Sequence, residues 1–393
     1  MISRLIKYLT ILLLLLFPLG LIFRFKLFAN VQVVPQDILA LSIFALILID
    51  YLKRKKRKME FFFKAQVIFV AVGIVSLAIN VFIFRDINLG SALLYIIRYL
   101  SYICLINVGT YFTDSKLVKR LVIWSGITFI LFGFIQYYFY NSLSGMRYLG
   151  WDNHLYRLFS TFLDPNFAGV FYVFFLFMIF HFQVGKKLKD SYFYLLLIFF
   201  DFLAIMMTYS RTALISLIAG VFAYYVIKRR LKIFFVILTF LLVSLFMFSD
   251  TMVEGLNPFR TASSHDRIVS LVNVKDIIMK NPLIGVGFNA FRDAQLRYGF
   301  RNSIGASLSN ADAGTDNSFL FAFAVTGIIG TIVFVFSYAS LMKKLIMEKN
   351  TFSIYLFCGL VGLITGSMFL NVLFYTPILG YVLIAVSLRK KLY

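Results

Sequence analysis

Residues 231–249 read LKIFFVILTFLLVSLFMFS, an apolar run with a single charged residue near its start. A helix needs about 20 predominantly apolar residues to cross the hydrocarbon core of a bilayer, so this run predicts a membrane-spanning helix. The residues that follow, 250–314, form the one long polar stretch of the chain. We therefore predict a helix in the membrane that leads into a large loop at a membrane surface.

Eleven other apolar runs have similar lengths. Hydrophobic residues make up 61% of the 393 positions and charged residues only 14%, whereas about 25% of the residues in a soluble domain are charged. The sequence therefore predicts an all-α polytopic integral membrane protein, with residues 1–393 in a single membrane domain. Its roughly 12 transmembrane helices are expected at residues 5–23, 35–52, 60–84, 89–112, 117–140, 161–182, 191–209, 211–228, 231–249, 315–342, 352–371 and 375–388.

Basic residues set the predicted orientation, because the cytoplasmic loops of membrane proteins are enriched in lysine and arginine. The run KRKKRK at residues 53–58 is placed in the cytoplasm. The other lysine-rich connections and both termini are then cytoplasmic, and residues 250–314 form an extracytoplasmic loop. This orientation explains the formal net charge of +22, so the charge predicts no nucleic-acid partner.

Neither the cysteines nor the first apolar run changes this assignment. Cys104 and Cys358 both fall in apolar runs, so no disulfide is expected in the outer loops. Residues 27–29, Leu-Phe-Ala, are a poor signal-peptidase site, so we expect the first run to be retained as a helix rather than cleaved.

The outer connections carry mainly arginine, whereas lysine predominates inside. Any positive charge suffices for orientation, but the guanidinium group is a rigid fork that binds phosphate through two hydrogen bonds. The polar stretch also holds a glycine-rich run, NPLIGVG at residues 281–287. We predict that the stretch binds an anionic group, with pairing between its arginines and local aspartates as the alternative. Its basic residues are Arg260, Arg267, Lys275, Lys280, Arg292, Arg297 and Arg301.

Arg98 is a charged residue at membrane depth. It lies about nine residues, or roughly 14 Å at the helical rise, inside its apolar run. A charge at that depth costs at least about 2.5 kcal/mol on insertion scales, so Arg98 is expected to face a cavity or a partner. Asp201, midway along the seventh run, is a candidate partner. The alternative is that the side chain of Arg98 extends to the outer surface.

Two predicted helices begin at the outer face with polar motifs. Residues 164–166, Asp-Pro-Asn, open the sixth span, and residues 210–212, Ser-Arg-Thr, open the eighth. A helix N-terminus carries unpaired N–H groups and a partial positive charge, both of which favour a phosphate. Ordinary helix initiation is the alternative for Asp164, and anchoring of a helix end at the interface is the alternative for Arg211.

Residues 263–279 predict an amphipathic helix within the polar stretch. Arg267 lies in its first turn, where the helix dipole disfavours a cation, so it is a functional candidate. An ion pair with Asp250 or Asp266 is the alternative. The stripe at helical spacing consists of Ile268, Leu271, Val272, Lys275, Ile278 and Met279.

In their order and spacing, these motifs resemble those of the bacterial O-antigen ligase and O-antigen polymerase superfamily. The resemblance covers about residues 160–335. The matching motifs are residues 164–166, residues 210–212, Arg267 followed by residues 281–287, residues 316–320 (DNSFL) and residues 325–330 (VTGIIG).

The resemblance implies a glycosyltransferase of the bacterial cytoplasmic (inner) membrane that uses no nucleotide, cofactor or metal. Its donor would be a glycan on undecaprenyl pyrophosphate, and Arg211 and Arg267 would hold the pyrophosphate. Ligases of the family carry a histidine at the position of Asp316, so this chain is expected to be a polymerase for O-antigen, capsule or exopolysaccharide, with a ligase as the alternative. Membrane lipid, a chain-length regulator and a flippase are the further expected partners.

The chemistry requires a base for the acceptor hydroxyl and positive charge for the leaving pyrophosphate. Asp316 is the expected base, with His265 and Asp312 in reserve, and ordinary helix capping is the alternative for Asp316. The other expected substrate-binding residues are Arg98, Arg260, Asn317, Asp164, Asn166 and His265.

A metal-dependent enzyme and a transporter are the alternatives. Asp312 and Asp316 could ligate a divalent cation, and a flippase or other transporter of the same lipid-linked substrate would also have about twelve spans and buried charges. The halves of the chain show no repeat, and the arginines gather on one face. These features favour chemistry at the outer face over alternating access.

Overall fold

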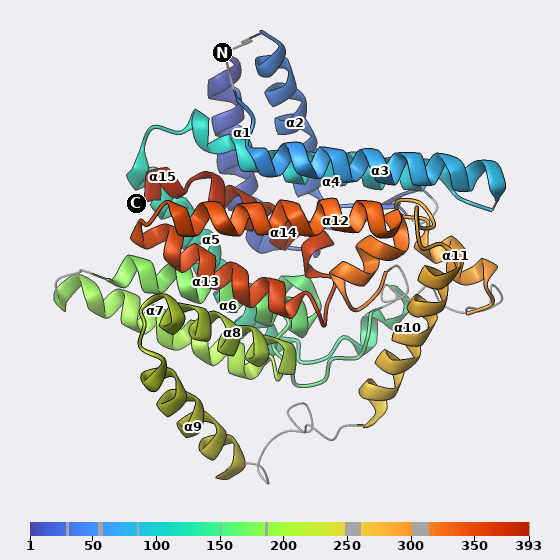
Figure 1. Ribbon diagram of the computed structural model, residues 1–393. Coiled ribbons are helices and arrows are strands. Elements are labelled where there is room, and N and C mark those ends of the chain that lie inside the picture. The colour runs from blue at the N-terminus through green and yellow to red at the C-terminus, as the bar shows by residue number, and fades with distance from the viewer. Residues whose placement is uncertain are drawn as a thin grey trace.

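The computed structural model describes residues 1–28, 31–53, 58–84, 86–149, 151–184, 188–247, 261–300 and 314–392. Figure 1 shows a bundle of helices in these ranges. The helices up to the polar stretch are α1 (Ile2–Leu16), α2 (Pro35–Lys53), α3 (Phe61–Ile83), α4 (Leu89–Cys104), α5 (Ser115–Phe139), α6 (Pro165–Gln183), α7 (Leu188–Met207), α8 (Arg211–Ile227) and α9 (Leu231–Met247). The later ones are α10 (Thr261–Lys280), α11 (Phe291–Arg297), α12 (Ser318–Met347), α13 (Thr351–Gly366), α14 (Thr376–Ser387) and α15 (Arg389–Leu392).

Each predicted span coincides with one helix, α4 being continued by the 3-10 helix η2 (Leu105–Tyr111). Seven of the described helices are long and apolar enough to cross a membrane. They confirm a helical polytopic membrane protein, but not the count of about twelve spans. Four shorter apolar helices accompany them in the described ranges, among them α14 with 12 residues. A helix of that size is about 18 Å long, so it does not cross a core of roughly 30 Å on its own.

A short hairpin between α1 and α2 is an exception to the all-α prediction. The strands β1 (Phe25–Phe28) and β2 (Val31–Val33) pair in antiparallel orientation, with Phe25 opposite Val33. The hairpin lies between α1 and α2 in the chain and leads directly into α2.

Helix α6 forms the centre of the bundle. Its span is 78% buried, more than any other described candidate span, and it packs against α7, α8 and α13. The rings of Phe171, Tyr172 and Phe175 are fully buried. Gly169 lets α8 approach, because a Cβ at that position would lie 2.7 Å from the side chain of Ala213. This packing brings the start of α8 beside the start of α6.

The predicted amphipathic helix is confirmed as α10, which packs on the first part of α12. Its buried face differs from the predicted stripe. Val274, Ile277 and Ile278 are buried against α12, whereas Leu271, Val272 and Met279 are exposed by 45%, 51% and 69%. The position of α12, rather than the periodicity of α10 alone, selects the buried residues.

Candidate functional site

The start of α6 is joined to the start of α8 by side-chain hydrogen bonds. Asp164 Oδ1 accepts from two backbone N–H groups of α6 at 2.7 and 3.3 Å, which confirms it as the helix cap. Asn166 Oδ1 accepts from Ser210 Oγ at 3.0 Å and from Arg157 Nη2 at 3.1 Å. Ser210 caps α8 directly before Arg211, which is half-buried. The two polar motifs therefore meet at one place.

Arg157 holds the connection between α7 and α8. Its Nε donates to the carbonyl oxygen of Thr208 at 2.9 Å, and its Nη2 donates to that of Tyr209 at 3.2 Å. Arg157 is not among the site residues predicted from the sequence. Its position in an outer connection, just before the motif at Asp164, is the signal that could have identified it.

The cap of α12 is Asn317, so the capping alternative for Asp316 is wrong. Asn317 Oδ1 accepts from two backbone N–H groups of α12 at 2.8 and 3.0 Å, and Nδ2 donates to the carbonyl oxygen of Met368 at 3.0 Å. The polar atoms of the Asn317 side chain are thus used within the protein. Asp316 is half-buried and directly precedes the cap.

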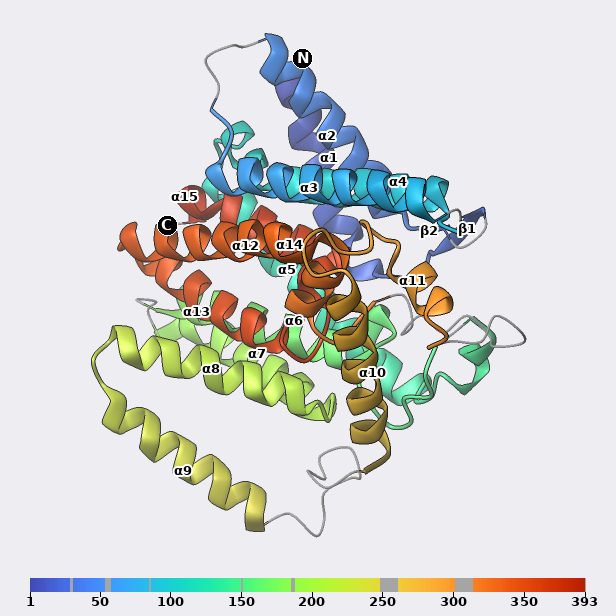
Figure 2. The same ribbon diagram turned by 45° about the vertical axis from the view of Figure 1, so that its right-hand side comes forward.

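The C-terminal end of α13 connects the starts of α8 and α12. A Cβ on Gly366 would lie 2.6 Å from Ser216 Oγ, so α13 touches α8 near its start. The carbonyl oxygen of the next residue, Ser367, accepts from the backbone N–H of Ser318 at 2.9 Å. Arg211, just ahead of Ser216 in α8, and Asp316, just ahead of Ser318, therefore flank the same helix end. Figure 2 shows α8, α13 and α12 in this arrangement.

The glycine-rich run at residues 281–287 docks on a kink in α12. The kink is at Gly327, whose φ is +64°. The N–H groups of Val286 and Gly287 donate to two carbonyl oxygens just before the kink, at 2.8 and 3.1 Å. A kink leaves such carbonyl groups without hydrogen-bond partners from their own helix. The glycine-rich run provides the missing N–H donors. These two N–H groups are therefore not available to an anionic ligand, in contrast to our prediction for the run.

The glycines at this contact are required by geometry. Gly285 has a φ of +71°, and a Cβ there would lie 2.5 Å from the backbone nitrogen of Thr326. A Cβ on Gly327 would lie 2.2 Å from the carbonyl oxygen of Leu283. The motifs at 281–287 and 325–330 are therefore packed against each other.

We expect Gly285→Ala to destabilise the protein far more than Gly299→Ala. Both glycines have a φ of +71°, but Gly299 has open space where a Cβ would be. Gly299→Ala should cost about 1–2 kcal/mol for the left-handed backbone, and Gly285→Ala should cost about 1–3 kcal/mol more for overpacking. Thermal unfolding in detergent measures the difference. Equal apparent Tm values would show that the docking of the run does not stabilise the fold.

Arg98 is paired with Asp37 on α2, not with Asp201. Its Nη2 lies 2.9 Å from Asp37 Oδ2 and also donates to the carbonyl oxygen of Gln32. The ion pair explains how the charge is tolerated at this depth, so extension to the outer surface is not needed. Asp201 is fully buried in α7, and neither of its carboxyl oxygens has a hydrogen-bond partner among the described residues.

Arg297 is paired with an aspartate, which is the alternative to anion binding by the arginines of the polar stretch. Its Nε and Nη2 donate to the two carboxylate oxygens of Asp86 at 3.0 and 2.7 Å, and its guanidinium carbon lies 3.6 Å from the ring centroid of Phe84. The hydrogen bonds from Arg297 lower the pKa of Asp86. This pair attaches α11 to the connection between α3 and α4.

Arg24 is a further arginine that is not among the site residues predicted from the sequence. Burial lowers its pKa, while Tyr375 and Tyr95 act in the opposite direction. Its guanidinium carbon lies 4.7 Å from the ring centroid of Trp151. Tyr375 stacks on Phe167, in the first turn of α6, at 4.3 Å. Arg24 is thus close to the joined starts of α6 and α8.

Several predicted site residues cannot be placed in this arrangement. Arg260 and Asp312 lie outside the described residues. Arg267 and His265 belong to α10, but their side chains are outside the described part of the structure. The predicted site residues whose side chains the structure describes are Arg211, Asp316, Asn317, Asp164, Asn166 and Arg98.

Comparison with known proteins assigns this part of the chain to a family. Residues 194–335 match the family model described as O-antigen ligase, and a search of curated proteins gave no match. The matched segment begins in α7, ends in α12 and includes Arg211, the glycine-rich run and Asp316. For residues 194–335, this match supports the resemblance to the O-antigen ligase and polymerase superfamily.

Proposed function

We propose that this protein is a repeat-unit polymerase. It transfers a glycan from undecaprenyl pyrophosphate to an acceptor sugar hydroxyl at the outer face of the cytoplasmic membrane, without a metal ion. The supporting observation is that Arg211 and Asp316 flank one end of α13 within the segment that matches the O-antigen ligase family.

Arg211 is the proposed pyrophosphate ligand. It is the first residue of α8, where the helix dipole also favours negative charge. As the glycosidic bond to phosphate breaks, the electron pair stays on the pyrophosphate. A fixed guanidinium stabilises this charge without reorganisation. Arg267 has the same proposed role through the family resemblance.

Asp316 is the proposed base. The acceptor oxygen forms a bond to the anomeric carbon, and its proton passes to the carboxylate of Asp316. Because Asn317 caps α12, the carboxylate of Asp316 is not needed for that purpose. A carboxylate is a weak base, but it suffices when the hydroxyl loses its proton late in a transition state that resembles an oxocarbenium ion.

A reconstituted assay tests this function. The purified protein is supplied with lipid-linked repeat units, with and without a lipid acceptor, in the presence of EDTA. We expect a ladder of lipid-linked polymers and released undecaprenyl pyrophosphate in both cases. Loss of the ladder in EDTA that magnesium restores would contradict metal independence.

The assay also separates the two alternatives. The matched family is described as a ligase, and a ligase would transfer glycan only when the lipid acceptor is present. A flippase would move the lipid-linked unit across the bilayer without releasing undecaprenyl pyrophosphate. Either result would replace the polymerase assignment.

A further inference from the structure

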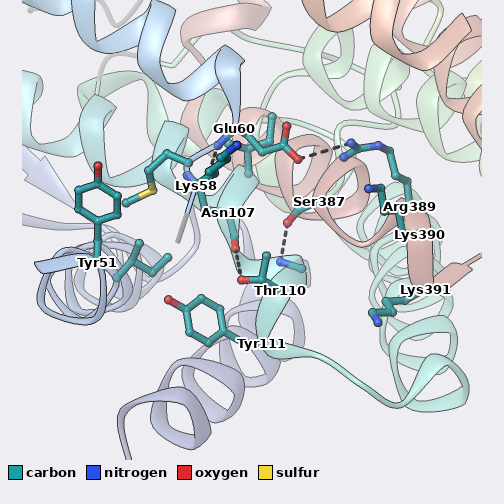
Figure 3. A pocket seen from close by; sticks show the side chains of 14 residues that line it. Tyr51, Lys58, Glu60, Asn107, Thr110, Tyr111, Ser387, Arg389, Lys390 and Lys391 are labelled. Carbon is teal, nitrogen blue, oxygen red and sulfur yellow. Dashed lines mark hydrogen bonds and ion pairs between the residues drawn. The ribbon is translucent and has the colours of Figure 1, made fainter. Parts of the chain in front are cut away.

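A pocket of about 240 Å³ lies at the opposite helix ends from Arg211 and Asp316. Figure 3 shows the side chains that line it. It is lined by the end of α2, the segment before α3, η2 and the start of α15. Helix α12 shows the separation, because it begins beside Asp316 and ends near Lys344, which pairs with Glu60 at the pocket. The basic residues around the pocket predict that this end is cytoplasmic.

The acidic groups beside the pocket are neutralised within the protein. Glu60 forms ion pairs with Lys344 and, at 3.5 Å, with Arg389. Arg389 Nε also lies 2.9 Å from Glu348 Oε1. Burial raises the pKa of Glu60, but the hydrogen bond from Lys344 and the two positive charges outweigh it, so the pKa is lowered. Two carboxylates and two cations therefore cancel, and the buried Arg389 is fixed in place.

Three lysines add an uncompensated positive charge. Lys58, Lys390 and Lys391 line the pocket and form no ion pair with the residues that the structure describes. Among the residues that the structure describes, Asp50 is a further carboxylate near the pocket, and it accepts a hydrogen bond from the Tyr111 hydroxyl at 3.0 Å. Even with Asp50 included, positive charge is in excess. Figure 3 shows Lys58, from the segment before α3, and Lys390 and Lys391, from α15, around one space.

One side of the pocket continues into an apolar surface. Ile47 and Tyr51, one turn apart on α2, line the pocket. On the adjoining face of the same helix, Leu48 and Leu52 are exposed by 36% and 74%. A ligand with a charged head and an apolar tail could therefore use both surfaces, with the head at the lysines and the tail along α2.

We propose that this pocket binds the phosphate headgroup of an acidic phospholipid of the inner leaflet. Lys58, Lys390 and Lys391 contact the phosphate, and the acyl chains lie along the apolar face of α2. Basic pockets at the cytoplasmic ends of membrane helices are suited to such headgroups. Inorganic phosphate shares the charged chemistry but cannot use the apolar surface. This site is separate from the proposed transferase site.

The test compares two triple variants of the full-length protein in detergent. One is Lys58→Gln with Lys390→Gln and Lys391→Gln. The control is Lys64→Gln with Lys232→Gln and Lys343→Gln, which removes three exposed lysines that do not line the pocket. Native mass spectrometry with added phosphatidylglycerol measures the affinity. We expect it to fall about a hundredfold in the pocket variant and less than about twofold in the control.

A second measurement on the wild-type protein does not depend on the folding of a variant. Bound ligand raises the apparent Tm, so phosphatidylglycerol should raise it and phosphatidylethanolamine should not. Equal losses of affinity in the two triple variants, or equal effects of the two lipids, would overturn the proposal. A rise in Tm with inorganic phosphate as large as that with phosphatidylglycerol would identify a free-anion site and overturn the lipid assignment.

Discussion

Replacing Asp316 by asparagine should slow glycan transfer at least about a hundredfold, the usual scale for loss of a general base. Asparagine keeps the size and much of the hydrogen bonding of aspartate but cannot accept the proton of the acceptor hydroxyl. The helix cap is unaffected, since Asn317 provides it. Donor binding should therefore remain normal, and only turnover should fall.

The matched control for this substitution is Asp114→Asn. Asp114 caps α5 at its N-terminal end by accepting a hydrogen bond from the backbone N–H of Leu117 at 3.1 Å. Asparagine caps a helix about as well as aspartate, so this variant should retain the stability and turnover of the wild type. Turnover is followed as release of undecaprenyl pyrophosphate, and donor binding is measured separately. Near-normal turnover in Asp316→Asn would leave His265 or Asp312 as the base.

The helices could be predicted from the sequence because their signals are local. An apolar run of about 20 residues predicts a membrane helix wherever it occurs, and α10 was identified by its periodicity. The choice between Asp316 and Asn317 as the cap was not predictable in this way. Both residue types cap helices well, and the contact of Asn317 with Met368 on a distant segment distinguishes them.

Contacts between segments that are distant in the chain could not be predicted from the sequence. Asp201 was one candidate partner of Arg98 because both charges lie at membrane depth, but the packing of α4 on α2 places Asp37 next to Arg98. The sequence predicts that the glycine-rich run binds an anion. In the structure, two of its N–H groups instead donate to carbonyl oxygens of α12 just before the kink. Neither result follows from local periodicity, since each depends on which helices are neighbours.

Arg211→Lys should lose transfer almost as completely as Arg211→Ala. Removing one preorganised donor to a developing oxyanion costs about 10²–10³ in rate. Lysine keeps the charge but lacks the fork that binds two phosphate oxygens at once. Polymer length on gels, at matched protein level, is the measurement. We expect short or absent polymer in both variants.

Arg297→Lys provides the control, because it removes an outer arginine whose fork is occupied by Asp86. It should leave polymer length unchanged, even where it lowers the apparent Tm. If Arg211→Lys also gives full-length polymer while Arg211→Ala does not, a single positive charge at the start of α8 is sufficient. Full-length polymer from Arg211→Ala would remove Arg211 from the site altogether, because no positive charge would then be needed at that helix end.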